Sequence, residues 1–385
     1  MAQFDVDAIN VESLRQRTSV KWRTFDPDVL PAWVAEMDFP LAAEVAAALH
    51  AAIDRSDTGY RSLDGLAESL VRFADDSWSW QFSRDDVFCA PDVLSAIAHS
   101  LSVLTRPGEA VVINPPVYHP FFPVVREVVG RGLVEVPMAR ADDGSYGWDL
   151  PALEQAFARP EVTAYLMSSP HNPTGSVPSR ETLEAISLMA STHGVSVVAD
   201  EIHASLVLPG AVHVPYLSVA TPEASAVSVL SASKAWNLPG LKCAQAVASP
   251  AIATRITATL PMSVSFGIGH LGVLATMAAY RDGAPWLGEV IAILDGNRRL
   301  LGDLLAEHLP RVRYTAPAAT YLAWLDLRDY GLGDDPAEAL LARGRVALSD
   351  GPSFGTQGRG FARLNFATSP AILREIVERM ATVVQ

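Results

Sequence analysis

Short apolar runs alternate with stretches of helical spacing through the middle of the chain, and this alternation restricts the fold more than any other feature. One intervening stretch, SRETLEAISLMASTHG, begins at Ser179, which suits a helix start, and ends at Gly194, which suits a helix end. Such an order favours an α/β fold with a mostly parallel sheet between helices. The runs predicted to be buried strands are AVVINPP from Ala110, VTAYLMSSP from Val162, GVSVVADEIH from Gly194, AVSVLSAS from Ala226 and CAQAVASP from Cys243.

The last hundred residues follow a different pattern, which predicts a smaller α+β domain. They contain an amphipathic helix over 295–309, two strands around a turn over 312–327, a strand over 361–367 and a closing helix over 369–384. We therefore expect an N-terminal arm with part of the small domain over residues 1–45, a large ligand-binding domain over 46–285 and the small C-terminal domain over 286–385.

Composition and charge exclude several classes of protein. Hydrophobic residues make up 49% of the 385, which favours a sizeable core over disorder. The net charge of −14 is expected to repel nucleic acid and anionic membranes. No apolar run reaches the roughly 20 residues of a membrane helix, and the start of the chain lacks the apolar core of a signal peptide. The two cysteines, Cys89 and Cys243, fit neither a disulfide framework nor a metal site. We expect a cytoplasmic protein without a metal.

Four polar residues follow the predicted strands, where parallel sheets bind ligands. Tyr118, Asn172, Asp200 and Lys234 each come shortly after an apolar run. Each has an ordinary structural interpretation: a core aromatic, a turn residue, a helix cap and a surface charge. Four such residues after four strands instead predict a shared site.

Three motifs carry a resemblance over nearly the whole chain. SSPHNPTG, ADEIH and SASKAWNLPGLK resemble the fold-type I pyridoxal-phosphate (PLP) enzymes, the aspartate aminotransferase superfamily. LPAWVAEMDFP, PPVYHPFF, DEIH and TYLAWLDL are more narrowly similar to the MalY/PatB group of cysteine-S-conjugate and cystathionine β-lyases. His203 and Lys242 stand where an ordinary class I aminotransferase tends to carry tyrosine and arginine, and both departures favour the lyase group.

The resemblance implies a role in PLP chemistry for several residues, and each role meets a requirement of that chemistry. Lys234 would form a Schiff base with the cofactor aldehyde and later take the substrate's Cα proton, so its pKa must be lowered by burial or a nearby cation. Asp200 would keep the pyridine nitrogen protonated. Tyr118 would stack on the ring as the third catalytic residue. Glu201 would point to the opposite face of the strand, and we interpret it as structural.

The remaining site residues are also implied by the resemblance. Asn172 and His203 would face the phenolic oxygen, although a lone histidine is as often structural. Arg363 would hold the substrate α-carboxylate, together with Asn172 and Tyr118. Tyr60 would reach the phosphate of the partner subunit in a homodimer. The other groups expected at the phosphate are the backbone N–H groups of Asp92, Val93 and Leu94 at a helix start, with Ser231, Ser233 and Lys242.

These features predict a PLP-dependent carbon–sulfur β-lyase that acts on an amino-acid thioether. The alternatives are an aminotransferase, which would use the same residues, and a regulatory protein that retains PLP. A dinucleotide-binding oxidoreductase is disfavoured because no GxGxxG follows the early strands. Trp33, Asp38 and Phe39 are candidates for the side-chain pocket, and core packing is an equal possibility for the two aromatics.

Overall fold

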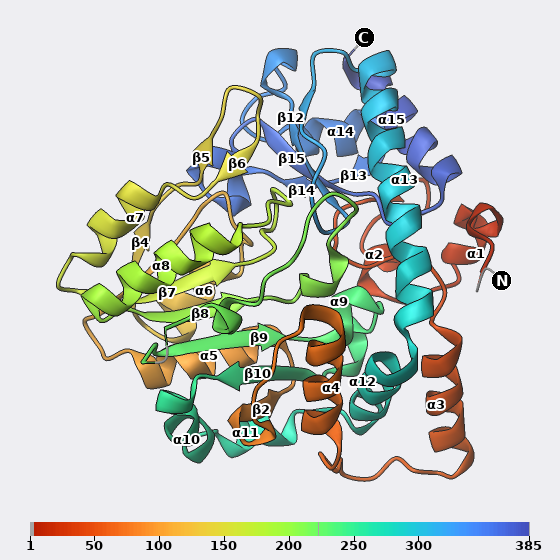
Figure 1. Ribbon diagram of the computed structural model, residues 1–385. Coiled ribbons are helices and arrows are strands. Elements are labelled where there is room, and N and C mark those ends of the chain that lie inside the picture. Colours follow the sequence, from red (N-terminus) through yellow and green to blue (C-terminus); the bar gives the residue numbers. More distant parts are fainter. Residues whose placement is uncertain (1–3, 222, 385) are drawn as a thin grey trace.

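Seven strands form the central sheet of the computed structural model, which describes residues 4–221 and 223–384 (Figure 1). Their order is β2-β10-β9-β8-β7-β3-β4, and every pair is parallel except those of β10, which is antiparallel to β9 and β2. The strands are β2 (Val87–Ala90), β3 (Ala110–Ile113), β4 (Gly132–Glu135), β7 (Val162–Ser168), β8 (Ser196–Asp200), β9 (Ala226–Leu230) and β10 (Ala244–Ala248). The predicted α/β fold with a mostly parallel sheet is confirmed.

Both faces of this sheet are covered in its middle, which explains why β3, β8 and β9 are buried along their whole length, whereas the edge strand β4 is partly exposed. Val111 and Ile113 enter a cluster with residues of α5 (Val93–Leu104), whereas Val112 enters a second cluster with residues of α7 (Leu150–Phe157) and α8 (Arg180–His193).

Helix α8 shows how the local sequence sets the ends of an element. The hydroxyl of Ser179 accepts the N–H of Thr182 at 3.2 Å, and Gly194 closes the helix with a φ of +68°, a conformation that favours glycine. The predicted start and end of this helix are confirmed.

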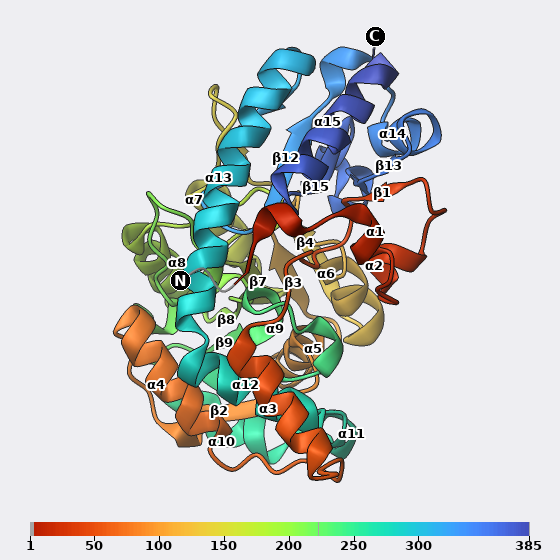
Figure 2. The ribbon, with the colours of Figure 1, turned by 90° about the vertical axis from the view of Figure 1, so that its right-hand side faces the viewer.

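A second, antiparallel sheet lies above the first in Figure 1 and has the order β11-β12-β15-β14. Its strands are β11 (Arg313–Tyr314), β12 (Leu322–Asp326), β14 (Ser349–Asp350) and β15 (Phe361–Asn365). Helices α13 (Ala284–His308) and α15 (Pro370–Val384) pack side by side against it and share its hydrophobic cluster (Figure 2).

The N-terminal arm joins this smaller domain through a short parallel pair. Strand β1 (Leu30–Pro31) lies beside β13 (Val346–Ala347). The chain then enters the large domain, where α3 (Ala43–Asp54) and α4 (Leu66–Trp78) pack against α12 (His270–Asp282). The residue limits of the two domains stay a prediction.

The other helices complete the layers around the two sheets. They are α1 (Val11–Leu14), α2 (Val20–Arg23), α3 (Ala43–Asp54), α4 (Leu66–Trp78), α6 (Phe121–Pro123), α9 (Ala232–Ala235), α10 (Pro250–Ala258), α11 (Met262–Phe266), α12 (His270–Asp282) and α14 (Pro336–Gly344). Within the described residues, no helix has the length and apolar character to cross a membrane. No group of three or more His, Cys, Asp or Glu side chains among them could hold a metal ion.

Candidate active site

A cavity of about 360 Å³ lies at the carboxyl ends of the parallel strands and brings together twelve of the thirteen residues predicted for catalysis, for the cofactor or for the substrate carboxylate. Tyr60 is the exception. Asp200 is the last residue of β8, and Lys234 lies in α9, directly after β9. Because β7, β8 and β9 are parallel neighbours, their ends place Asn172, Asp200 and Lys234 at one edge of the sheet. The twelve are Asp92, Val93, Leu94, Tyr118, Asn172, Asp200, His203, Ser231, Ser233, Lys234, Lys242 and Arg363.

Lys234 differs from the other two lysines of the chain in having no carboxylate partner. Lys21 pairs with Asp38 at 2.8 Å, and Lys242 pairs with Asp92 at 3.1 Å. Among the described residues, no carboxylate comes within ion-pair distance of the Lys234 amine. Burial, and then the charge of Arg363, lowers the pKa of Lys234 to about 8. Lys234 therefore holds a readily neutral amine.

Asp200 is a buried carboxylate close to that amine. Its Oδ1 accepts the N–H of Ile202 at 3.1 Å, and burial raises its pKa to about 7. A cationic ring nitrogen beside it would favour the ionised form. Glu201 points to the opposite face, where its Oε1 accepts the N–H of Tyr216 at 2.7 Å.

Arg363 is buried without a carboxylate partner among the residues that the structure describes. Its Nη1 donates to Asn172 Oδ1 at 2.9 Å, while Nη2 donates to the Trp33 carbonyl and to Ser349. Its guanidinium carbon lies 4.9 Å from the ring centre of Phe354, and burial lowers its pKa to about 10. A buried, unpaired cation of this kind is suited to an incoming carboxylate.

His203 and Tyr118 also line the cavity. Burial lowers the pKa of His203 to about 3, so its ring is neutral, and its Nδ1 has no hydrogen-bond partner among the described residues. Tyr118 lies mostly buried beside Phe121, with 5.8 Å between ring centres.

One end of the cavity has the groups expected to bind a phosphate. The Asp92 side chain caps α5 by accepting the N–H of Ser95 at 2.9 Å, and its other oxygen pairs with Lys242. The N–H groups of Val93 and Leu94 lie in the first turn of α5, where intrahelical partners are lacking. These donors and the partly exposed Lys242 make this end attractive to an anion.

The three candidates for the side-chain pocket lie in different places, and Phe39 takes the core packing that its sequence left open. Trp33 lines the cavity, but Asp38 and Phe39 do not. Asp38 is held inside the protein by Lys21, and Phe39 packs in the core against Phe4, with ring centres 5.6 Å apart. Between Trp33 and Asp38, the chain therefore passes from the wall of the cavity into the core.

Tyr60 lies outside the cavity on an exposed loop, and 91% of its side chain is accessible. It packs edge-on against Phe266 of α11, and Arg61 donates to Ser265 of the same helix. In the single chain, Tyr60 therefore faces outward.

Sequence reasoning missed His119 and Ser349, which also line the cavity. His119 follows Tyr118 directly in the stretch PPVYHPFF, and this position next to a predicted site residue could have indicated it. Ser349 reaches the site because β14 pairs with β15 in a register that sets Ser349 opposite Arg363. No local pattern indicates a two-residue strand of this kind.

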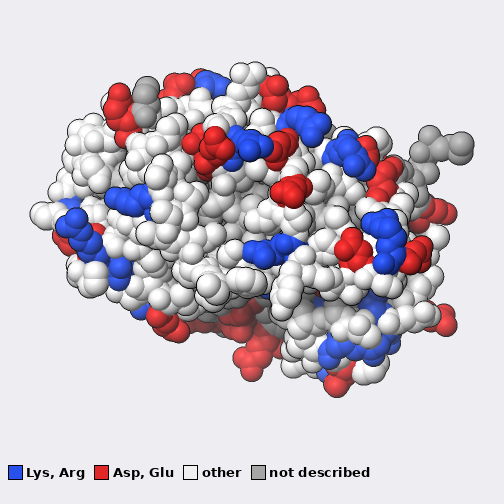
Figure 3. Space-filling model, turned by 90° about the horizontal axis from the view of Figure 1, so that it is seen from below, with Lys and Arg blue, Asp and Glu red and all other residues white. Residues whose placement is uncertain are grey.

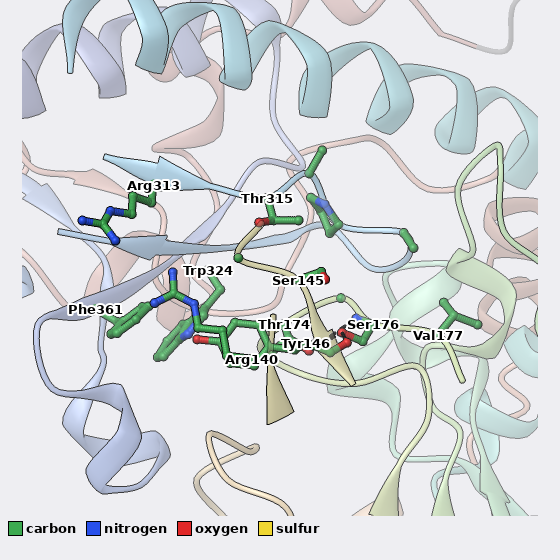
Figure 4. A pocket seen from close by; sticks show the side chains of 15 residues that line it. Arg140, Ser145, Tyr146, Thr174, Ser176, Val177, Arg313, Thr315, Trp324 and Phe361 are labelled. Atoms are coloured by element: carbon green, nitrogen blue, oxygen red, sulfur yellow. Dashed lines mark hydrogen bonds between the residues drawn. The ribbon is translucent and has the colours of Figure 1, made fainter. Parts of the chain in front are cut away.

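A second cavity, of about 230 Å³, lies between the two domains but lacks the predicted groups (Figure 4). Figure 4 shows Arg140 beside Phe361 and Trp324, and its guanidinium carbon is 5.4 Å from the Phe361 ring centre. Arg140 and Arg313 are already paired, with Asp326 and Asp329 respectively. This cavity is therefore a poorer candidate.

Comparisons with known proteins agree with this geometry. The family model for aminotransferase class I and II matches residues 34–380. A provisionally named cystathionine β-lyase of Mycobacterium leprae is 43% identical, over 99% of this chain and 98% of its own. Cystathionine β-lyase PatB of Bacillus subtilis is 34% identical, over 94% and 95%. The crystal structure of cystalysin from Treponema denticola, which contains pyridoxal 5′-phosphate, has a TM-score of 0.91 at 25% identity and covers 96% of each chain. The chain belongs to the aminotransferase class I and II family and, within it, to the MalY/PatB group.

Proposed function

We propose that this chain is a PLP-dependent carbon–sulfur β-lyase, which cleaves cystathionine or a related cysteine S-conjugate to a thiol, pyruvate and ammonia. The observation that carries the proposal is one cavity that holds the unpaired amine of Lys234, the buried carboxylate of Asp200 and the unpaired guanidinium of Arg363. The relatives favour β-elimination as the reaction, because those from M. leprae and B. subtilis are named as cystathionine β-lyases.

The cavity fits PLP chemically. His203 Nδ1 and Arg363 Nε are buried without partners among the described residues, as is typical of groups that serve a ligand. Lys234 would bond the aldehyde carbon, Asp200 would face the ring nitrogen, and Tyr118 would stack on the ring. The remaining contacts would be Asn172 and His203 at the phenolic oxygen, and Val93, Leu94, Ser231, Ser233 and Lys242 at the phosphate. When bound, PLP supplies an electrophilic carbon and a ring that withdraws electrons from the substrate's Cα.

The protein's own groups then bind the substrate and move its proton. The planar fork of Arg363 takes the α-carboxylate in a bidentate contact. With a pKa of about 8, much of Lys234 is neutral in weakly alkaline solution, and it removes the Cα proton. The freed electron pair forms the Cα–Cβ double bond, and sulfur leaves Cβ with the electrons of the broken bond. The resulting 2-aminoacrylate takes up water and yields pyruvate and ammonia.

Transamination is the second candidate, because the matching family model is named for aminotransferases. The same residues would bind and deprotonate the substrate. The two reactions differ in their needs, since transamination requires a keto acid to accept the amino group and β-elimination does not.

We expect pyruvate to form from cystathionine or an S-alkyl cysteine without any keto acid, in a one-to-one ratio with the released thiol. Pyruvate is measured by a coupled dehydrogenase and thiol by a chromogenic disulfide. Enzyme that has been reduced with borohydride serves as the control, because reduction ties PLP to Lys234 through a saturated carbon–nitrogen bond that the substrate amine cannot displace. Strict dependence on an added keto acid would favour the aminotransferase instead.

We also propose that the chain works as a homodimer in which Tyr60 serves the partner's cavity. An exposed apolar patch, formed by Tyr60, Met262 and Phe266, supports this proposal, with exposed fractions of 91%, 74% and 58%. Figure 3 views the molecule from the side of α3, α10 and α11 and shows broad uncharged areas there. Apolar side chains that are held in place on a surface are typical of an interface.

Subunit mixing tests this arrangement. Lys234→Ala and Tyr60→Ala homodimers are each expected to be impaired. After subunit exchange, a mixed dimer contains one cavity with Lys234 from one chain and Tyr60 from the other. If Tyr60 crosses the interface, an equal mixture recovers about a quarter of the wild-type sites, as two-fold symmetry requires. No recovery after verified exchange would place Tyr60 in its own chain's site or in none.

A further inference from the structure

The segment over residues 33–39 is fixed by side chains that hold its backbone groups from both domains. The amide nitrogen of Asn365 donates to the carbonyls of Val34 and Glu36, at 2.8 and 2.7 Å. The Asn237 side chain bonds both the N–H and the carbonyl of Met37, each at 2.9 Å. The backbone between these anchors has little freedom to move.

The Ala35 carbonyl lies at the centre of this segment and accepts two side-chain hydrogen bonds. The Lys234 amine donates to it at 2.8 Å, and the hydroxyl of Tyr321 donates to it at 3.0 Å. Tyr321 is fully buried in the small domain. Because a carbonyl oxygen has two lone pairs, these two donors occupy its full capacity.

We propose that the Ala35 carbonyl, held in place by Tyr321, orients the Lys234 amine whenever that amine is not bonded to a cofactor, which makes Tyr321 a positioning residue. This inference rests on the proposed function. With one N–H tied to Ala35, the nitrogen is held at the wall of the cavity, and its lone pair can turn towards the space where the Cα proton must be taken. Tyr321 itself is not among the residues that line the cavity.

The Tyr321 hydroxyl also affects the charge of the amine. A charged Lys234 ammonium would bind the Ala35 carbonyl more strongly than a neutral amine does. The Tyr321 hydroxyl shares this carbonyl, and so it reduces the preference for the charged form. Removing the hydroxyl should therefore favour the charged form of Lys234. The charged and titratable groups that face Lys234 are Arg363 on β15, Asp200 on β8, Glu36 in the 33–39 segment and His203.

The Tyr321→Phe variant tests the proposal, with Tyr280→Phe as a matched control. Tyr280 is also buried, but its hydroxyl donates to Gln245 at 2.9 Å, outside the cavity. For Tyr321→Phe we expect kcat to fall about fivefold with KM unchanged, as for the loss of one hydrogen bond. We expect the acidic limb of the pH–kcat profile to move up by about half a pH unit.

A second readout needs no turnover. Apoprotein is mixed with PLP at several pH values, and visible absorbance follows the capture of the aldehyde by Lys234. Capture by Tyr321→Phe should require higher pH than capture by wild type or Tyr280→Phe. If Tyr321→Phe does not fold, Asn365→Ala, which frees the carbonyls on both sides of Ala35, should show the same fall in kcat.

The outcomes separate this inference from the proposed function. Wild type that binds no PLP or releases no pyruvate contradicts the proposed function. The positioning role is overturned if wild type is active and Tyr321→Phe matches Tyr280→Phe in kcat, pH profile and PLP capture. A variant that loses only thermal stability also overturns it.

Discussion

The Lys234→Ala variant is expected to keep its fold and to lose pyruvate formation by roughly 10⁴-fold, because it lacks both the covalent anchor and the base. Folding should survive, since the Ala35 carbonyl keeps the hydrogen bond from Tyr321 and no buried acceptor is left unpaired. The variant should also lack the visible absorbance that wild type gains with PLP.

Borohydride reduction and peptide mapping identify the anchoring lysine directly. With only three lysines in the chain, each lies in a readily separated peptide. The stable PLP label should appear on the Lys234 peptide of wild type and be absent from the variant. A label on Lys21 or Lys242 would contradict the assignment, and the ion pairs of those two lysines make that outcome unexpected.

Asp200→Asn is expected to lower turnover by roughly 10²- to 10³-fold, because an amide cannot stabilise a protonated ring nitrogen as a carboxylate does. The same change should stabilise the apoprotein. Burial raises the pKa of Asp200 from 3.8 to about 7, so over this range the folded chain holds a proton that the unfolded chain has released. The free energy of unfolding therefore falls as pH rises through this window and stays lower above it. Asparagine avoids that loss, so apoprotein melting should rise by a few degrees at about pH 8 and be unchanged at about pH 4.

Glu201→Gln is the matched control for Asp200→Asn. Glu201 is the adjacent residue, and burial raises its pKa to about 8. Its side chain faces away from the cavity, and glutamine keeps an oxygen that can accept the N–H of Tyr216. The control should gain apoprotein stability in alkaline solution and keep its turnover. Equal losses of turnover in both variants would show that the effect of Asp200→Asn is not specific to the cavity.

The sequence predicts those parts of the fold and the site that are set locally. Helix α8 has its cap at Ser179 and its glycine at Gly194, and Asn172 and Lys234 follow recognisable strands. In a parallel sheet, the ends of neighbouring strands meet at one edge, so a local pattern is enough to predict a shared site.

The site contacts that the sequence did not predict depend on segments that lie far apart in the chain. Lys234 meets the Ala35 carbonyl across 199 positions, and Tyr321 meets it across 286. No periodicity in the 33–39 segment tells which of its residues face the cavity, so the sequence could not separate Trp33, which lines it, from the candidate Asp38, which does not. A backbone carbonyl also carries no residue type that a motif could reveal.

Because β1 pairs with β13, a growing chain can complete this part of its structure only late in synthesis. The central sheet draws on residues 87–248, so its strands are complete well before synthesis ends. Leu30, by contrast, emerges early and finds its partner Val346 only near the end of translation. Arg363 is made later still. Nascent chains that stop before this point therefore have a complete central sheet but lack Arg363, the residue that we propose binds the substrate carboxylate.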